Sequence, residues 1–110
     1  MKEPHWPLDE VKRLAAAGKI WVQKTRAAAF FPTTREAVEV ATAIALTLDV
    51  GAFSCTQELT HDVADVYGIV RDGDGWFLKL CIDVEAPELL IISLHPLERP
   101  LVTNAGVVKP

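Results

Sequence analysis

The spacing of hydrophobic residues predicts two amphipathic helices in the first half of the chain. Apolar residues recur every three or four positions over residues 8–17, and Gly18 follows them as a C-terminal cap would. The same period returns over residues 34–48, where Thr33 and Glu36 have the spacing of a capping box. The second helix is longer and is expected to be the main helix packed on the sheet.

The pattern between these helices is less decisive. Residues 20–22 form a short apolar run that fits either a strand or a packed connector. Residues 25–31 are rich in alanine and can form a helix, which Pro32 would end. The first segment therefore stays open, and a short helix is predicted for the second.

Beyond Gly51 the hydrophobic period changes from about 3.6 to about 2 residues, which is typical of strands. Four strands are predicted, over residues 53–59, 63–71, 76–84 and 89–95. Turn sequences at 72–75 and 85–88 separate the last three strands, and short hairpin connections make these strands antiparallel neighbours. We therefore expect an α+β fold, with N-terminal helices packed on one face of an antiparallel sheet of three to four strands.

The chain has 110 residues, half of them hydrophobic, and is expected to form one domain. Residues 1–50 should be mainly helical, residues 51–96 should form the sheet, and residues 97–110 should form a surface tail. No apolar run reaches the ~18 residues of a membrane span, and no signal-peptide pattern occurs, so we expect a cytoplasmic protein without membrane contacts. Cys55 and Cys81 are then expected to be free thiols on strands, and they lack zinc-site spacing.

The net charge of −4 is distributed unevenly. Residues 1–35 hold seven basic and three acidic residues, and residues 36–98 hold two basic and twelve acidic residues. The last twelve residues hold two basic and no acidic residues. The sheet-forming half is therefore acidic, which is unfavourable for long-range attraction of a phosphate backbone. Any contact with nucleic acid is expected to use the basic N-terminal region or an isolated lysine.

Alternation along the predicted strands suggests a polar surface on one face of the sheet. Side chains of a strand point alternately to its two faces, so Tyr67, Lys79 and His95 can all lie on the face away from the helices. A phenol, an ammonium and an imidazole in one place are capable of acid–base chemistry. The sequence does not determine the register, and a slip of one residue would move each side chain to the other face.

Short motifs occur in order along residues 4–95. They are Pro4-His5 followed by Leu8, Val11-Lys12-Arg13-Leu14, Ala17-Gly18, Asp65-Val66-Tyr67, Phe77-Leu78-Lys79-Leu80 and Leu90-Ile91-Ile92-Ser93. Their order and spacing resemble the MqsR family, the motility quorum-sensing regulator toxins, which are small mRNA interferases with a RelE-like α+β fold. The resemblance implies the toxin of a type II toxin–antitoxin system, an endoribonuclease that cleaves mRNA without a cofactor. It also implies a cognate antitoxin as partner, through which the complex could bind operator DNA.

The chain departs from the family pattern at four positions usually linked to RNA cleavage. The segment Ala52-Phe53-Ser54-Cys55-Thr56 lacks the lysine that the family carries there, and Ala64 stands where the family has glutamine. Phe77 stands in place of a tyrosine, and His95 in place of a lysine. Of the four, only His95 remains able to transfer a proton. The tail after His95 also exceeds the family's usual ending.

RNA cleavage without a metal needs a base for the 2′-hydroxyl proton, an acid for the leaving 5′-oxygen and a cation beside the phosphate. His95 can act as acid or base near neutral pH, and Lys79 could stabilise the charge that builds on the phosphoryl group. Tyr67 could donate a hydrogen bond or stack on a base, and His61 could supply another imidazole. These four side chains are the predicted catalytic residues.

Each of these side chains also has an ordinary structural interpretation. Lys79 can be a solvated lysine, His95 a strand-end residue and Tyr67 a half-buried residue of the sheet. The acidic sheet and the missing family residues favour a second hypothesis, in which the fold is a protein-binding module without catalytic activity. Exposed Trp6, Trp21 or the tail would then contact the partner.

Overall fold

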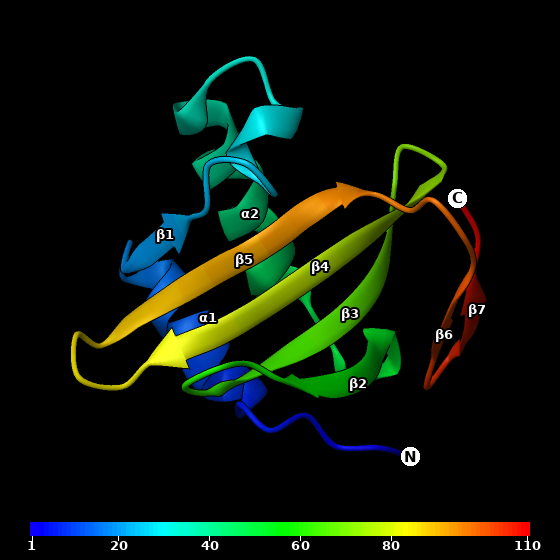
Figure 1. The fold of residues 1–110 in the computed structure, drawn as a ribbon, viewed down its shortest axis with the longest axis horizontal. Helices are drawn as coiled ribbons and strands as arrows, with labels where there is room; N and C mark the ends of the chain where they lie inside the picture. The colour runs from blue at the N-terminus through cyan, green and yellow to red at the C-terminus, as the bar shows by residue number, and fades with distance from the viewer.

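Two helices lie on one face of a five-stranded sheet, and a small hairpin flanks the sheet near the C-terminus (Figure 1). The computed structural model describes every residue from Met1 to Pro110. The elements in chain order are α1 (Leu8–Ala16), β1 (Ile20–Val22), the 3-10 helix η1 (Ala28–Phe30), α2 (Thr34–Thr47), the 3-10 helix η2 (Val50–Ala52), β2 (Phe53–Glu58), β3 (Val63–Arg71), β4 (Asp74–Asp83), β5 (Glu88–Pro96), β6 (Leu101–Thr103) and β7 (Gly106–Val108). The large sheet has the strand order β1-β5-β4-β3-β2.

The α+β class predicted from the sequence is confirmed, but the sheet has more strands than predicted and is mixed. The additional strand is β1, which runs parallel to β5, whereas every other neighbouring pair is antiparallel. The pairing extends past both ends of β1, because Leu89 N–H donates to the Lys19 carbonyl at 2.8 Å and Gln23 N–H donates to the Ile91 carbonyl at 3.0 Å. Three residues are too few for periodicity to separate a strand from a connector.

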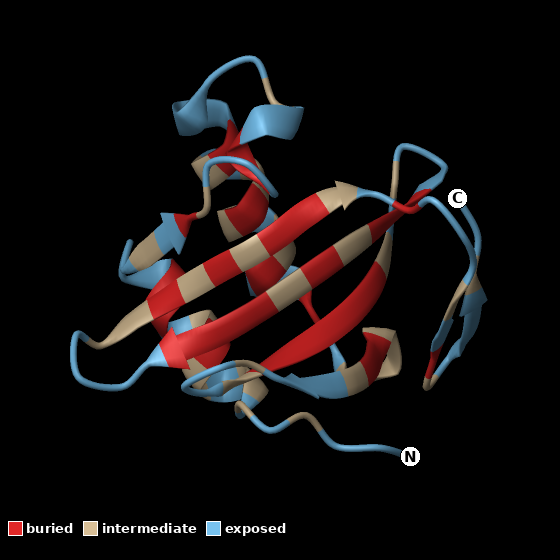
Figure 2. Cartoon of the chain, in the orientation of Figure 1, coloured by how far each residue is buried: buried red, intermediate tan, exposed pale blue.

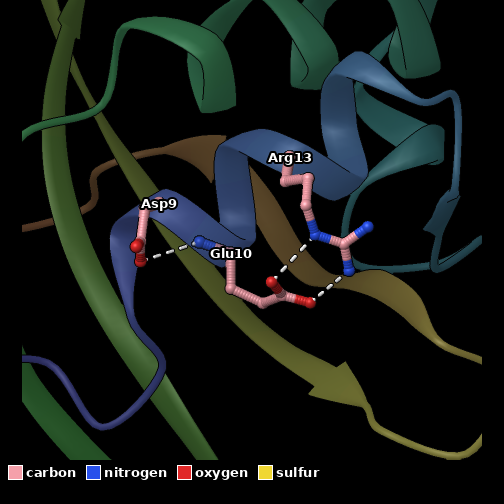
Figure 3. A network of polar contacts seen from close by, with 3 residues as sticks. All are labelled: Asp9, Glu10 and Arg13. Atoms are coloured by element: carbon pink, nitrogen blue, oxygen red, sulfur yellow. Dashed lines mark hydrogen bonds and ion pairs between the residues drawn. The ribbon is translucent and has the colours of Figure 1, made fainter.

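The helix α1 begins with acidic residues and has a basic residue in its last turn, an arrangement that suits the helix dipole. The Asp9 carboxylate accepts the N–H of Glu10 at 3.0 Å, and the Arg13 guanidinium donates two hydrogen bonds to the Glu10 carboxylate (Figure 3). The hydrogen bonds between Arg13 and Glu10 lower the pKa of Glu10 and raise the pKa of Arg13. Arg13 is therefore occupied by a carboxylate on its own helix.

The helix α2 begins as the capping box predicts, because the Thr33 hydroxyl accepts the N–H of Glu36 at 3.1 Å. Its buried face consists of alanines at a spacing of four residues, Ala37, Ala41 and Ala45. Small side chains on this face let the helix axis approach the sheet closely.

The helix predicted over residues 25–31 is wrong in extent, because only the single turn η1 forms there. The N–H groups of Ala28 and Ala29 bond to the carbonyls of Gln23 and Lys24, one residue further back than in an α-helix. Ala28 is buried in the core, so packing of this loop against the sheet overrides the helix propensity of its alanines.

The core lies between the helices and the sheet. It contains 19 buried residues, drawn from α1, α2 and all five strands of the large sheet. Figure 2 shows how much of β3, β4 and β5 is buried, in contrast to the exposed turns. Neither helix has the length and apolarity that crossing a bilayer requires.

A bulge in β5 sets which of its side chains face away from the helices. Two successive residues of β4 pair with Ile91 and Ser93, so Ile92 has no partner. An unpaired residue inverts the alternation of the strand beyond it. Ile91 and Leu94 therefore both reach the core, and His95 faces the opposite side.

The segment 97–110, predicted as a surface tail, forms the hairpin β6–β7, which packs beside β2 and β3. Asn104 N–H donates to the Phe53 carbonyl at 2.9 Å. A β-carbon at Gly75 would lie 2.1 Å from the carbonyl oxygen of Lys109, so only glycine allows the two backbones to approach this closely.

Candidate active site on the open face of the sheet

The face of the sheet that points away from α1 and α2, the open face, is covered by no helix (Figure 1). Strand pairing places Phe77 opposite His95 and Lys79 opposite Ser93 on this face. Lys79 and His95 are thus diagonal neighbours on two adjacent strands. They share the face away from the helices, as predicted, and their catalytic role stays a prediction.

His95 lies near the end of β5 between two phenylalanine rings. The Phe77 ring stacks on it with centroids 5.2 Å apart, and the Phe30 ring lies at 5.3 Å with a tilt of 38°. The Nδ1 atom is 2.9 Å from the carbonyl oxygen of Pro96. Because a carbonyl oxygen only accepts, Nδ1 carries the proton of this hydrogen bond. Nε2 is buried and has no hydrogen-bond partner, so it is not exposed to the cavity.

A cavity of about 450 Å³, the open-face cavity, lies beside His95, and its volume is typical of a small-ligand site. Its lining comes from three segments that are far apart in the sequence: Arg26 after β1, Phe77 and His95 on the sheet, and residues 97–101 between β5 and β6. The carbonyl of Arg26 accepts the N–H of a β5 residue at 2.9 Å, which fixes this loop beside the cavity.

The cationic side chains near this cavity are free of carboxylate partners. Arg13 and Arg35 form the ion pairs of the chain, each with a glutamate of its own helix. Arg26, Lys79 and Arg99 form none, and the Arg26 and Arg99 side chains also make no hydrogen bond within the chain. Unpaired guanidinium groups lining a cavity provide donors for a phosphate or carboxylate.

Lys79 lies further along the open face and points toward the edge strand β2. Its Nζ donates to the Gln57 side-chain oxygen at 3.3 Å. The contact is with a neutral group, so the positive charge of Lys79 remains available to an anion on this face.

The prediction that Tyr67 shares the open face with Lys79 and His95 is wrong. Tyr67 is fully buried in the core on the helix side, and its ring packs edge-on against Phe53 at 5.6 Å. The pairing of β3 with β4 places it opposite Leu78, which is also in the core. Burial raises the pKa of the Tyr67 phenol, and the nearby Asp65 carboxylate adds to this shift.

His61 is not brought together with His95. It is exposed in the turn between β2 and β3, whereas His95 lies near the end of β5. The register pairs the end of β3 with the start of β4, and the start of β4 with the end of β5, so the turn that holds His61 is at the opposite end of the sheet.

Asp65 has a structural role that its position in the motif does not reveal. It is fully buried, and its carboxylate accepts the backbone N–H groups of His5 and Trp6 at 3.0 and 2.7 Å. It also accepts the Thr56 hydroxyl at 2.6 Å. The Trp6 indole donates to the Val63 carbonyl at 3.0 Å. The N-terminal segment is thus tied to β3.

Both cysteines are free thiols. Burial raises the pKa of the Cys81 thiol to about 11, and the carboxylates of Asp62 and Asp83 add to this shift. A thiol with that pKa is a weak nucleophile at neutral pH. No group of three or more His, Cys, Asp or Glu side chains is arranged to hold a metal ion.

A second cavity, of about 370 Å³, lies between α2 and the C-terminal hairpin. The only ionisable residue in its lining is Asp49, whose carboxylate already accepts the N–H of Gly51 at 2.7 Å. It therefore offers no acid–base pair.

Sequence reasoning missed three residues of the open-face cavity, Arg26, Glu98 and Arg99. Arg26 follows β1 and the other two follow β5, so no local motif joins them. For the two arginines the only signal in the sequence is the basic character of the first 35 and last twelve residues, and Glu98 has none. The comparisons add no family to these observations, since no protein-family model and no curated protein sequence matches the chain.

Proposed function

We propose that this chain is the toxin of a type II toxin–antitoxin system, with a RelE-like arrangement of helices and sheet. In this proposal it is an endoribonuclease that cleaves mRNA by metal-independent acid–base chemistry and is neutralised by a cognate antitoxin. The observation that carries the proposal is the open-face cavity, whose lining includes His95 and two arginines without ion-pair partners, Arg26 and Arg99.

Two of the positions at which the chain departs from the MqsR pattern lie together in the structure. Phe77 pairs with His95, and both line the open-face cavity, whereas Ala64 is fully buried. Sequence motifs that are distant along the chain therefore converge on one surface. Two of the four family positions named above, Phe77 and His95, belong to that surface.

The cavity brings together cations and an imidazole, which are groups that RNA cleavage uses. Arg26 and Arg99 would bind the scissile phosphate, and His95 would exchange a proton with the 2′-hydroxyl or the leaving 5′-oxygen. Phe30, whose ring is 49% exposed, presents an aromatic surface beside the imidazole on which a nucleobase can stack. Lys79 would contact a neighbouring phosphate along the open face.

The alternative function is a protein-binding module with the same fold and no catalysis. The specific observation in its favour is Trp21 on the edge strand β1, whose side chain is 45% exposed. Trp76 is buried, and Trp6 is partly buried and hydrogen-bonded to Val63, so neither offers as much surface. A large exposed aromatic residue is typical of an interaction site.

Incubation with a defined mRNA in the presence of a chelator, with and without ribosomes, tests the nuclease proposal. We expect cleavage by the wild-type chain and a loss of at least about 10²-fold in rate for His95→Ala, because proton transfer by a positioned side chain contributes that much. His61→Ala is the matched control, since this exposed imidazole lies at the far end of the sheet.

The outcome also separates the two functions. Wild-type protein that is folded but cleaves no RNA in either reaction contradicts the nuclease and favours the binding module. If His95→Ala and His61→Ala both cleave at the wild-type rate, the chain is a nuclease whose site is elsewhere.

A further inference from the structure

β1 is an outer strand of the large sheet, and its far side pairs with no other strand (Figure 1). The Lys19 carbonyl and the Gln23 N–H, just before and just after the strand, bond to β5. Residues two apart on an extended strand direct their backbone groups to the same side, so the N–H and C=O groups of Ile20 and Val22 face the free side. An extended segment of another molecule can bond to such groups and add a strand to the sheet.

The side chains of β1 leave room along this free edge. Val22 belongs to the core and Ile20 packs against it, so both point toward the helices. Trp21 points to the open face, where its side chain is 45% exposed beside its register partner Leu90. A cavity of about 420 Å³, the edge cavity, follows β1 and reaches the start of α2 at Thr34. Side chains of an added strand would alternate between the indole on one face and this cavity on the other.

The charge around this edge indicates the chemistry of the added strand. Lys19 and Lys24 are exposed at the two ends of β1, and neither forms an ion pair. Lys24 is the only ionisable residue in the lining of the edge cavity, and the N-terminal turn of α2 adds its positive dipole there. A segment with an apolar centre and carboxylates at its ends therefore complements the edge.

A second copy of this chain fits the edge less well. Antiparallel pairing of two β1 strands about Trp21 would place Lys19 of one copy next to Lys24 of the other. Like charges that meet across neighbouring strands are destabilising. The two lysines thus oppose self-pairing, as edge lysines commonly do, and favour an acidic partner.

We propose that β1 binds an extended acidic segment of another protein as an added antiparallel strand. Antiparallel pairing lets Ile20 and Val22 each form a hydrogen-bonded pair with the segment, and it leaves Trp21 at the intervening pair, where side chains lie closest. Lys19 and Lys24 contact the carboxylates at the two ends of the segment. The edge cavity and the open-face cavity share no residue, so this inference does not rest on the proposed nuclease.

The test is a titration of the full-length chain with the synthetic peptide Glu-Glu-Val-Val-Val-Glu-Glu, its ends blocked, followed by NMR of the backbone amides. The control peptide has lysine in place of each glutamate. We expect the acidic peptide to slow hydrogen exchange at the Ile20 and Val22 amides, and the control peptide to bind at least about tenfold more weakly, because it turns attraction at both ends of β1 into repulsion.

Single variants test the side chains at the edge. Lys24→Glu should bind the acidic peptide several-fold more weakly than wild type and the lysine peptide more tightly, since the charge at that end of β1 is reversed. Trp21→Ala should weaken binding of the acidic peptide several-fold through loss of the indole contact. Lys109→Glu is the matched control, because it makes the same charge change at an exposed position beyond β7, and it should bind as wild type does.

Other outcomes of the titration would overturn the proposal. An acidic peptide that perturbs the amides of His95 and Arg99 but not those of Ile20 and Val22 would be bound at the open-face cavity instead. Equal affinity for the two peptides, or no binding at millimolar peptide, would remove the acidic strand as the occupant. A chain that is dimeric before peptide is added, with the Ile20 and Val22 amides already protected, would assign the edge to a second copy. None of these results depends on cleavage of RNA, so the two proposals can fail separately.

Discussion

The hydroxyl of Tyr67 and Nε2 of His95 are the buried side-chain atoms that have no hydrogen-bond partner in the chain. Their surroundings differ. The Tyr67 ring is fully enclosed by the core on the helix side of the sheet, whereas the His95 ring borders a cavity on the open face. Both atoms are buried, so the hydrogen bond that each lacks is a cost in stability.

At the residue scale, the change Tyr67→Phe is expected to raise the free energy of unfolding by about 1 kcal/mol, because it removes a buried hydroxyl that gains no hydrogen bond. Urea denaturation of the variant and the wild type measures the difference. We also expect the variant to keep any toxicity that the wild type has on induced expression. A folded Tyr67→Phe variant that lost toxicity would restore the phenol to a catalytic role.

At the scale of elements, the buried carboxylate of Asp65 joins three segments. It connects the N-terminal residues before α1, through the N–H groups of His5 and Trp6, to β3, and through the Thr56 hydroxyl to β2. The chain therefore enters α1 from a fixed point on the sheet. A carboxylate with three donors explains how a charged residue stays fully buried.

The change Asp65→Ala is expected to lower the free energy of unfolding by about 3 kcal/mol, because the two N–H groups and the hydroxyl lose a charged acceptor in a buried place. Denaturant unfolding measures the loss, and hydrogen exchange should show faster exchange at the amides of His5 and Trp6. Asp9→Ala is the control, since Asp9 is exposed and accepts one local N–H. Equal stability of the two variants would contradict the anchoring role of Asp65.

At the scale of the whole molecule, folding concentrates cations that the sequence keeps apart. The sheet-forming half is acidic, yet Arg26 comes from the basic N-terminal region and Arg99 from the basic tail, and both reach the open-face cavity. The ion pairs of Arg13 and Arg35 are on the helices, away from this cavity. Net charge therefore underestimates how well one small site can attract a phosphate.

Global stability is expected to fall as the pH rises above about 9. Burial, with help from Asp62 and Asp83, raises the pKa of Cys81 from its ordinary 9.0 to about 11, and the pKa of Tyr67 is also raised. Between pH 9 and 11 the unfolded chain releases the thiol proton while the folded chain keeps it, so the unfolded state binds fewer protons and stability falls with pH. Ionisation of the Tyr67 phenol in the unfolded chain adds to this loss of stability above pH 10, the ordinary pKa of the group.

Thermal unfolding between pH 8 and 11 measures this dependence. In Cys81→Ala the melting temperature should fall less over the range 9 to 11, although the variant is less stable at every pH because it lacks a buried side chain. A slope identical to that of the wild type would show that the thiol ionises equally in both states.

Local sequence patterns were sufficient to predict most of the helices and strands. The helical period over residues 8–17 and 34–48 and the capping box at Thr33 predict α1 and α2 closely, because caps and amphipathic faces are encoded within a few neighbouring residues. The alternation over residues 63–71 matches β3 in full. The helix predicted for the alanine-rich residues 25–31 was wrong because their propensity is helical while their packing requires a tight turn.

The candidate site was only partly predictable from the sequence, because its residues come from distant parts of the chain. Lys79 and His95 were expected on the open face. Strict alternation along β5 would put His95 on the same face as Ile91, which lies in the core, and the bulge at Ile92 moves His95 to the open face. Tyr67 was assigned to the wrong face because a single residue of register exchanges the two sides of a strand. Arg26, Glu98 and Arg99 carry no local pattern at all.

By itself, the sequence determined the α+β class, the two helices, the four strands from β2 to β5 and the acidic charge of the sheet-forming half, because periodicity and composition are local properties. Only the tertiary structure decided the parallel edge strand β1, the C-terminal hairpin packed against the sheet, the burial of Tyr67 and the meeting of His95 with Arg26, Glu98 and Arg99. These features depend on contacts between residues far apart in the chain, which are set by pairing register and packing of the whole molecule.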